Sequence, residues 1–140
     1  MEDVRWSDER QKWLEEVYEK LKVKMREECI RAKNKIPYSA VDGVFDDRSN
    51  EKEINFWTNG FWPGMLWQMY HATNEECYKE AARIVEEKFD YLLDEYIRLH
   101  HDVGFMWLHT AVADYRLTGN EKSRVRGLHA ASLLAILRKI

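Results

Sequence analysis

Two kinds of helical segment alternate along the chain, and this alternation restricts the possible fold more than any other feature. The segments from about Pro63 to Ala72 and from about Val103 to Leu117 are apolar on nearly every side. The segments from about Glu75 to Arg98 and from about Glu121 to Lys139 carry one apolar stripe and a charged opposite face. Because a helix that is apolar all round must be covered on more than one side, the alternation predicts inner helices enclosed by outer amphipathic ones.

An internal repeat supports this arrangement. Gly60-Phe61 matches Gly104-Phe105, Tyr70 matches Tyr115, and Thr73-Asn74-Glu75 resembles Thr118-Gly119-Asn120-Glu121. The offset of roughly 44 to 46 residues suits one helical hairpin per repeat. Two similar hairpins in a bundle, or a short helical solenoid, stay open as alternatives, since periodicity alone does not separate them from a barrel.

The rest of the chain adds one more helix and one irregular segment. A helix is expected from Ser7 to about Lys33, because Ser7 suits a helix start and apolar residues recur every four positions. These apolar residues are Trp13, Val17, Leu21 and Met25, while Glu16 and Lys20 lie on the wet side. Residues 34–59 contain Pro37, Gly43 and Asn50 and are expected to be irregular, with a solvated turn at Asp46-Asp47-Arg48. The fold class is therefore all-α, in a single domain over residues 1–140.

Composition limits the class of protein. With 45% hydrophobic and 34% charged residues, a folded domain is expected rather than disorder. A net charge of only −3, without a long basic run, argues against nonspecific nucleic-acid binding. Cys29 and Cys77 lack CxxC spacing and are expected to be buried or half-buried thiols. No membrane span and no signal peptide are expected, so we expect a cytoplasmic protein.

Polar clusters precede both apolar helices. Trp57-Thr58-Asn59-Gly60 precedes the first, and His100-His101-Asp102 precedes the second. If the two helices are parallel, both clusters lie at one end of the molecule. Helix N-termini carry unpaired N–H groups and partial positive charge, so this end would suit an acidic sugar.

Each of these residues also has a simpler interpretation. From spacing alone, Asp102 fits an N-cap of the following helix better than a catalytic role. Trp57 and Trp62 are more often core residues than sugar platforms. His101 and His109 lie eight positions apart without an HExxH-type pattern, so no metal site is expected.

Two motifs resemble the unsaturated glucuronyl hydrolase family. They are WTNGFWPGMLW at residues 57–67 and HDVGFM at residues 101–106, and YRLTGNE at residues 115–121 fits the same pattern. The likeness runs from about Ile54 to Ala135, with a looser fit for the first helix. Two separated motifs in the right order are more specific than either one alone.

The resemblance implies a six-hairpin α/α barrel, of which this chain would hold about two and a half hairpins as the N-terminal part. Members of the family remove a 4,5-unsaturated uronic acid from the non-reducing end of oligosaccharides that polysaccharide lyases release. The resemblance implies that Asp102 is one of two essential carboxylates and that His101, Trp57 and Phe105 line the substrate pocket, with Asn59 and Trp62 as weaker candidates. It implies no cofactor.

The family's main acid/base aspartate comes from a later inner helix, for which this chain has no position. We therefore expect no turnover by the 140 residues alone, and self-association through exposed apolar inner helices. Two other functions stay open. One is a related hydrolase acting on unsaturated rhamnogalacturonides, and the other is a non-catalytic helical binding or assembly module.

Overall fold

The computed structural model describes residues 6–32, 34–96 and 98–137, and these residues form an almost entirely helical fold. In chain order the elements are α1 (Asp8–Ala32), β1 (Ala40–Val41), β2 (Val44–Phe45), the 3-10 helix η1 (Trp57–Gly60), α2 (Phe61–Thr73), α3 (Glu76–Lys88), α4 (Asp90–Glu95), the 3-10 helix η2 (His101–Val103), α5 (Gly104–His109), α6 (Ala111–Thr118) and α7 (Glu121–Leu137). The predicted all-α class is confirmed. None of the described helices is long and apolar enough to cross a membrane.

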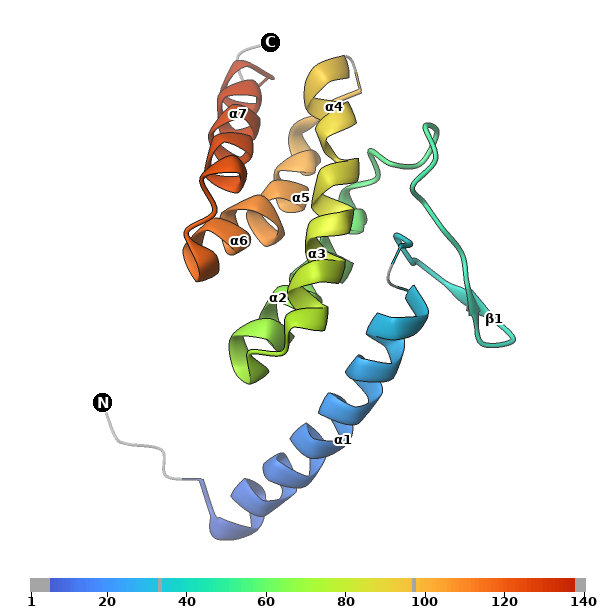
Figure 1. Cartoon of the computed structure of the whole chain (residues 1–140), viewed down its shortest axis with the longest axis vertical. Coiled ribbons are helices and arrows are strands. Elements are labelled where there is room, and N and C mark those ends of the chain that lie inside the picture. Colours follow the sequence, from blue (N-terminus) through green and yellow to red (C-terminus); the bar gives the residue numbers. More distant parts are fainter. Residues whose placement is uncertain (1–5, 33, 97, 138–140) are drawn as a thin grey trace.

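The helices form two hairpins side by side, as Figure 1 shows. In the first hairpin α2 runs one way and α3 with α4 returns, and in the second α5 with α6 runs parallel to α2 and α7 returns. α1 packs against α3 and α2 at its C-terminal end. Together the described elements make two complete hairpins and one additional helix, which is the partial α/α-barrel arrangement that the family resemblance implies.

The two apolar inner segments are α2 and the pair α5 with α6. Both end in the same way, which explains the repeated sequence. Asn74 after α2 and Gly119 after α6 adopt left-handed conformations, with φ of 57° and 74°. Such residues end helices by satisfying the last carbonyls, and the N–H of Asn74 bonds to the carbonyl of Tyr70 as that of Gly119 does to Tyr115. The repeat therefore encodes the turn of each hairpin.

The apolar stripe of the first returning helix forms much of the core. Its buried members are Tyr78, Ala81, Ala82, Val85, Phe89, Leu92 and Leu93, whereas Tyr96 at the end of α4 is 39% exposed. Cys29 is buried and Cys77 is half-buried, and they form no disulfide, as expected. The period of the sequence therefore predicts correctly which face of this helix turns inward.

Two of the expected helices are broken. The predicted helix from Glu75 to Arg98 divides into α3 and α4 at Phe89, where i→i+3 bonds replace the regular pattern. The predicted helix from Val103 to Leu117 breaks at Thr110, which has φ −114° and ψ −90° and donates its hydroxyl hydrogen bond to the carbonyl of Met106 at 2.6 Å. A threonine side chain that bonds to its own helix competes with the backbone pattern, and sequence periodicity does not report this.

A proline assignment also needs correction. Pro63 is expected at the first helical position, but α2 begins two residues earlier, at Phe61. Pro63 still lies within the first turn, where the N–H that proline lacks has no partner inside the helix. The helix therefore tolerates it at this position.

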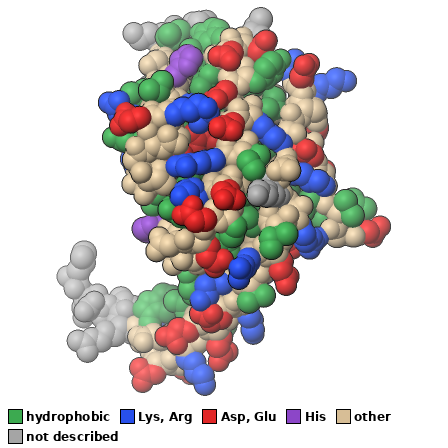
Figure 2. Space-filling model, viewed as in Figure 1, with side chains coloured by type: hydrophobic (Ala, Val, Ile, Leu, Met, Phe, Trp, Pro, Cys, Tyr) green, Lys and Arg blue, Asp and Glu red, His purple; other side chains and the backbone are tan. Residues whose placement is uncertain are grey.

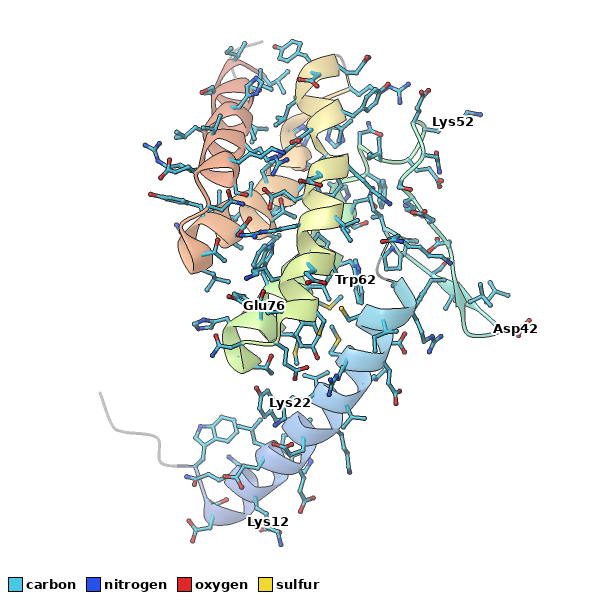
Figure 3. All side chains as sticks on the ribbon, in the orientation of Figure 1. Lys12, Lys22, Asp42, Lys52, Trp62 and Glu76 are labelled. Carbon is cyan, nitrogen blue, oxygen red and sulfur yellow. The ribbon has the colours of Figure 1, made fainter. Side chains whose placement is uncertain are left out.

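The segment from residue 34 to 59 is more ordered than predicted. β1 and β2 pair antiparallel around Asp42-Gly43, whose φ values of 51° and 75° both lie in the left-handed region. An Asp-Gly pair with this geometry is the preferred two-residue hairpin turn, a signal that the sequence contains and that was missed. Figure 3 shows Asp42 at the tip of this hairpin.

Asp46-Asp47-Arg48 lies in a loop with Asp47 exposed, as expected, but its side chains are bonded to the loop and not merely solvated. The Asp46 carboxylate accepts the backbone N–H groups of Tyr38 and Ser39 at 2.7 and 2.9 Å. The Arg48 guanidinium stacks on the Tyr38 ring, 3.5 Å from its centroid. These side chains hold the loop together, because they satisfy backbone groups that have no helix or sheet partner.

The stripe of α1 is the largest departure from expectation. Trp13, Val17 and Leu21 are exposed, whereas Met25 is half-buried against the core and full burial begins at Cys29 and Ala32. In Figure 1 the N-terminal half of α1 extends away from the two hairpins. An amphipathic pattern predicts which face can be buried, but it does not supply the partner that buries it.

Candidate functional site

A close backbone contact brings the two predicted motifs together. A Cβ on Gly60 would lie 2.5 Å from Met106 Cα and 2.9 Å from the Phe105 carbonyl oxygen. Only glycine allows η1 to approach α5 this closely. Because η1 lies against the start of α5, the residue that opens η1, Trp57, comes to lie beside Phe105.

Four rings form an aromatic cluster at this junction, hereafter the aromatic cluster, consisting of Trp57, Phe61, Phe105 and His109. The Trp57 centroid is 5.6 Å from those of both Phe61 and Phe105, and the Phe61 centroid is 5.1 Å from that of His109. Phe61 and Phe105 are 39% and 44% exposed, and Trp57 is half-buried. Rings that are packed on one side and open on the other can stack against the apolar face of a sugar.

The carboxylate of Asp102 lies between two histidines at the start of the second inner segment. His101 Nε2 is 3.3 Å from Asp102 Oδ1, and His100 Nδ1 is 4.0 Å from Asp102 Oδ2. The side chains of His100, His101 and Asp102 are 40%, 88% and 42% exposed. An exposed carboxylate with imidazoles beside it can accept hydrogen bonds from sugar hydroxyls, while the imidazoles can donate to an acidic group.

The structure does not favour the interpretation of Asp102 as an N-cap. Asp102 lies inside η2, whose N-cap is His100, and that cap makes no side-chain hydrogen bond. Ligand atoms of His100, His101 and Asp102 lie within 4.8 Å of one another, so these three residues are the group in the described chain that could hold a metal ion. The open carboxylate is equally accessible to an organic ligand.

Asn59 and Trp62, the two weaker candidates, are both buried. Asn59 is 2% exposed, and its amide nitrogen donates to the carbonyls of Glu53 and Ile54 at 2.9 and 3.1 Å. It holds the preceding loop against η1. Trp62 is 7% exposed and lines a shallow groove with Tyr38, Phe61 and Met65. Figure 3 shows Trp62 among the packed side chains of the molecule.

Two members of the aromatic cluster were missed by sequence reasoning. Phe61 matches Phe105 in the repeat and could have been predicted from that correspondence. No motif signals His109, which also lines a second groove with Gln68, His71 and Arg116 between α2 and α6. The surface beside the aromatic cluster therefore offers cationic and hydrogen-bonding side chains that the motifs do not reveal.

Comparisons with known proteins find relatives of this chain in sequence. No protein-family model matches the chain. The unsaturated glucuronyl hydrolase of Bacillus sp. strain GL1 is 38% identical over 92 residues, which cover 63% of this chain and 24% of that protein. The unsaturated chondroitin disaccharide hydrolase of Streptococcus pneumoniae is 34% identical over 79 residues, which cover 56% of this chain and 20% of that protein.

The likeness extends to three dimensions. A solved structure of a UGL variant with dGlcA-Glc-Rha-Glc aligns with 79% of this chain and 29% of its own chain, at a TM-score of 0.65 and 29% sequence identity. The chain spans about a quarter of the length of the curated relatives it matches, or less. Over the matched part it is similar in both sequence and fold to the unsaturated glucuronyl hydrolases, which confirms the resemblance that its two motifs indicate.

Proposed function

We propose that the chain forms part of a glycoside hydrolase site for lyase-generated, glycosaminoglycan-type oligosaccharides that carry a 4,5-unsaturated glucuronic acid at the non-reducing end. The observation that carries this proposal is the exposed Asp102 carboxylate, with His101 Nε2 at 3.3 Å. It lies at the start of an inner segment whose Phe105 joins the aromatic cluster. We propose that all of residues 1–140 belong to a single domain, the N-terminal part of an α/α barrel.

Each group has a role in holding the sugar. Asp102 accepts hydrogen bonds from hydroxyls of the unsaturated uronic acid, and His101 donates to its carboxylate or ring substituents. Trp57 and Phe105 pack against its apolar face. Asn59 is bonded within the preceding loop and Trp62 is buried beside Phe61, so we propose no direct ligand contact for these two residues.

The reaction that suits such a sugar is the hydration of its double bond. A proton is added at carbon 4, water attacks carbon 5, and the resulting hemiketal opens and releases the remaining sugar. Because the vinyl ether itself is hydrated, the two-carboxylate displacement of ordinary glycosidases is not the template. Asp102 positions the substrate in this scheme, and a second aspartate supplies the proton and activates the water.

The second aspartate is proposed to come from outside these 140 residues. The chain therefore binds the unsaturated disaccharide and does not turn it over when isolated. A longer chain that includes the next inner helix would restore turnover, which is followed as loss of ultraviolet absorbance of the conjugated double bond.

Binding by the 140-residue chain is tested by titration with unsaturated chondroitin disaccharide, using NMR chemical-shift changes or calorimetry. Asp102→Asn should weaken binding about 10-fold or more, because a hydrogen bond to a charged group contributes roughly 1.5–3 kcal/mol. Asp94→Asn is the matched control, since Asp94 is an exposed carboxylate on α4. Equal binding by parent and Asp102→Asn would remove Asp102 from the site.

The alternatives predict other outcomes. An unsaturated rhamnogalacturonide that binds more tightly than the chondroitin disaccharide would favour the related hydrolase. Binding without turnover, even in a longer folded chain, would favour a non-catalytic binding module. A chelator is included in parallel, and loss of binding on chelation would assign a metal to His100, His101 and Asp102.

A further inference from the structure

The N-terminal half of α1 carries an uncovered apolar surface, hereafter the α1 stripe. It consists of Trp13, Leu14, Val17 and Leu21, which are 59%, 48%, 38% and 44% exposed. The segment projects from the body of the molecule, and Figure 3 marks its two ends with Lys12 and Lys22. Several large apolar side chains that are exposed together indicate an interaction surface.

We propose that the α1 stripe pairs with the α1 stripe of a second copy of this chain, with the two helices antiparallel. Trp13, Val17 and Leu21 follow one another at four-residue spacing, so they lie along one face of the helix. A two-fold axis near Val17 would bring the two Val17 side chains together and place Trp13 against Leu21 of the second copy. Such a contact uses the same surface on both copies, as two-fold dimers do.

The charges on α1 are divided in a way that favours this pairing. Residues 8–19 contain five acidic and two basic side chains, whereas residues 20–26 contain four basic and no acidic ones. Two of those basic residues are already paired within the chain, Lys22 with Glu19 and Arg26 with Glu75, which leaves Lys20 and Lys24. Figure 2 shows acidic and basic side chains along this projecting part of the molecule. An antiparallel pair places each acidic half against the basic half of the other copy, whereas a parallel pair places like charges together.

The complementarity holds for individual residues beside the stripe. With about 3.6 residues per turn, Glu9, Glu16, Lys20 and Lys24 lie along the same flank of the α1 stripe. In the antiparallel pair Glu9 approaches Lys24 of the second copy, and Glu16 approaches Lys20. Among the described residues, none of these four side chains forms an ion pair within its own chain.

The first test is the oligomeric state of the parent chain over a range of concentrations, measured by analytical ultracentrifugation. A contact of this size is small for a stable interface, so a dissociation constant on the order of micromolar is expected. Val17→Glu should weaken the dimer at least tenfold. Leu108→Glu is the matched control, because Leu108 is a 50% exposed apolar residue on α5, and it should leave the dimer unchanged.

Two results of this test would overturn the proposal. The parent could stay monomeric over the whole range, in which case another partner or another segment covers the α1 stripe. Alternatively, Leu108→Glu could dissociate the dimer while Val17→Glu does not. That outcome would assign self-association to the inner helices instead.

A charge exchange tests the flanking residues. Glu9→Lys with Glu16→Lys makes the flank wholly basic, and Lys20→Glu with Lys24→Glu makes it wholly acidic. Each doubly substituted chain alone should dissociate at low salt, and an equal mixture should recover a dimer at least as strong as the parent. Dissociation of neither variant would show that the charges do not direct the pairing.

Cysteine crosslinking tests the orientation. Chains with Trp13→Cys and with Leu21→Cys, each in a Cys77→Ser background, are oxidised separately and as a mixture. The antiparallel pair predicts a disulfide-linked dimer mainly in the mixture, whereas a parallel pair crosslinks each variant with itself. The Cys77→Ser chain alone measures any background from the buried Cys29.

Discussion

Asp102 and Asp114 belong to the same inner segment, but their surroundings are opposite. Asp114 on α6 is fully buried, and it is surrounded by hydrogen-bond donors. These donors are Arg83 through two nitrogens at 2.9 and 3.0 Å, Thr118 at 2.6 Å, Asn120 at 2.7 Å and Ser123 at 2.8 Å. Asp102 is 42% exposed, with His101 Nε2 at 3.3 Å and His100 Nδ1 at 4.0 Å.

The contrast separates a structural carboxylate from one that is available to a ligand. Asp114 connects three elements, because Arg83 comes from α3 and Ser123 from α7. A buried carboxylate that is fully hydrogen-bonded has no acceptor sites left for a substrate. The acceptor sites of Asp102 remain open. Substitution of Asp114 should therefore mainly lower stability, whereas substitution of Asp102 should mainly weaken ligand binding.

A second buried carboxylate extends the structural network. The hydroxyl of Ser123 contacts both Glu86 Oε1 and Asp114 Oδ2, but it has one hydrogen and donates to one oxygen at a time. When Ser123 donates to Asp114 Oδ2, a protonated Glu86 can in turn donate to the Ser123 hydroxyl oxygen. Burial raises the pKa of Glu86, and the nearby Asp114 charge acts in the same direction, although Ser123 and Arg126 oppose them.

The largest expected effect is on Asp114. Asp114→Ala removes the shared acceptor of Thr118, Asn120 and Ser123 and the partner of the partly exposed Arg83, and should lower the free energy of unfolding by about 3 kcal/mol. Urea denaturation followed by circular dichroism measures this change. Asp94→Ala, at an exposed position on α4, should change it by less than about 0.5 kcal/mol. A loss below about 1 kcal/mol for Asp114→Ala would contradict the structural role, since even a single neutral hydrogen bond contributes that much.

The next effect concerns the contact that brings the two motifs together. Gly60→Ala forces a Cβ to within 2.5 Å of Met106 Cα, so the backbone must shift, at a cost of about 1–3 kcal/mol. The same shift should separate Trp57 from Phe105 and weaken disaccharide binding. Gly104→Ala is the control, because its Cβ would meet only the flexible tip of Leu134 at 2.8 Å. Equal losses of stability in the two variants would show that the approach of η1 to α5 is not the constraint.

A smaller effect is expected in the pH dependence of stability. Burial acts to raise the pKa of Asp114, but hydrogen bonds from Arg83, Thr118, Ser123 and Asn120 outweigh it, so the pKa lies below 3.8. Its stabilisation is therefore complete above pH 3.8 and is lost as the pH falls further. For Glu86 the pKa lies above 4.5, so its contribution is complete below pH 4.5 and is lost as the pH rises through the folded pKa.

Substitutions separate the pH dependence of stability that arises from Asp114 from the one that arises from Glu86. The stability difference between the parent and Asp114→Asn should shrink as the pH falls below 3.8. Relative to Glu86→Gln, the parent should lose stability as the pH rises above 4.5. Urea midpoints at several pH values measure both. A Glu86→Gln difference that does not vary with pH would show that Glu86 titrates as it does in the unfolded chain.

The smallest expected effect is that of Asp102→Asn on stability. Because Asp102 is half exposed and supports no other described element, its free energy of unfolding should differ from that of the parent by less than about 0.5 kcal/mol. Thermal unfolding measures this difference on the same sample that is used for the ligand titration. A large loss of stability would place Asp102 with Asp114 as a structural residue.

Part of the candidate site could be predicted from the sequence, and part of it could not. Trp57, Phe105, His101 and Asp102 are all named by the two motifs; Trp57 and Phe105 lie 5.6 Å apart, and His101 and Asp102 lie in η2, directly before α5. Asn59 belongs to the same motif, yet its amide is used within the loop. A motif records which residues recur together, whereas burial decides whether a side chain can reach a ligand.

The approximate helical segments, the buried face of α3 and α4 and the turns after α2 and α6 could all be predicted from the sequence, because they follow from local periodicity and from residues that suit left-handed conformations. The three-dimensional structure was needed to find that the acceptor sites of Asp114 are all occupied whereas those of Asp102 are open, and that the α1 stripe is exposed. These outcomes depend on contacts between residues that are far apart in the chain. Arg83 and Asp114 are one example, and no local pattern specifies their distance or their burial.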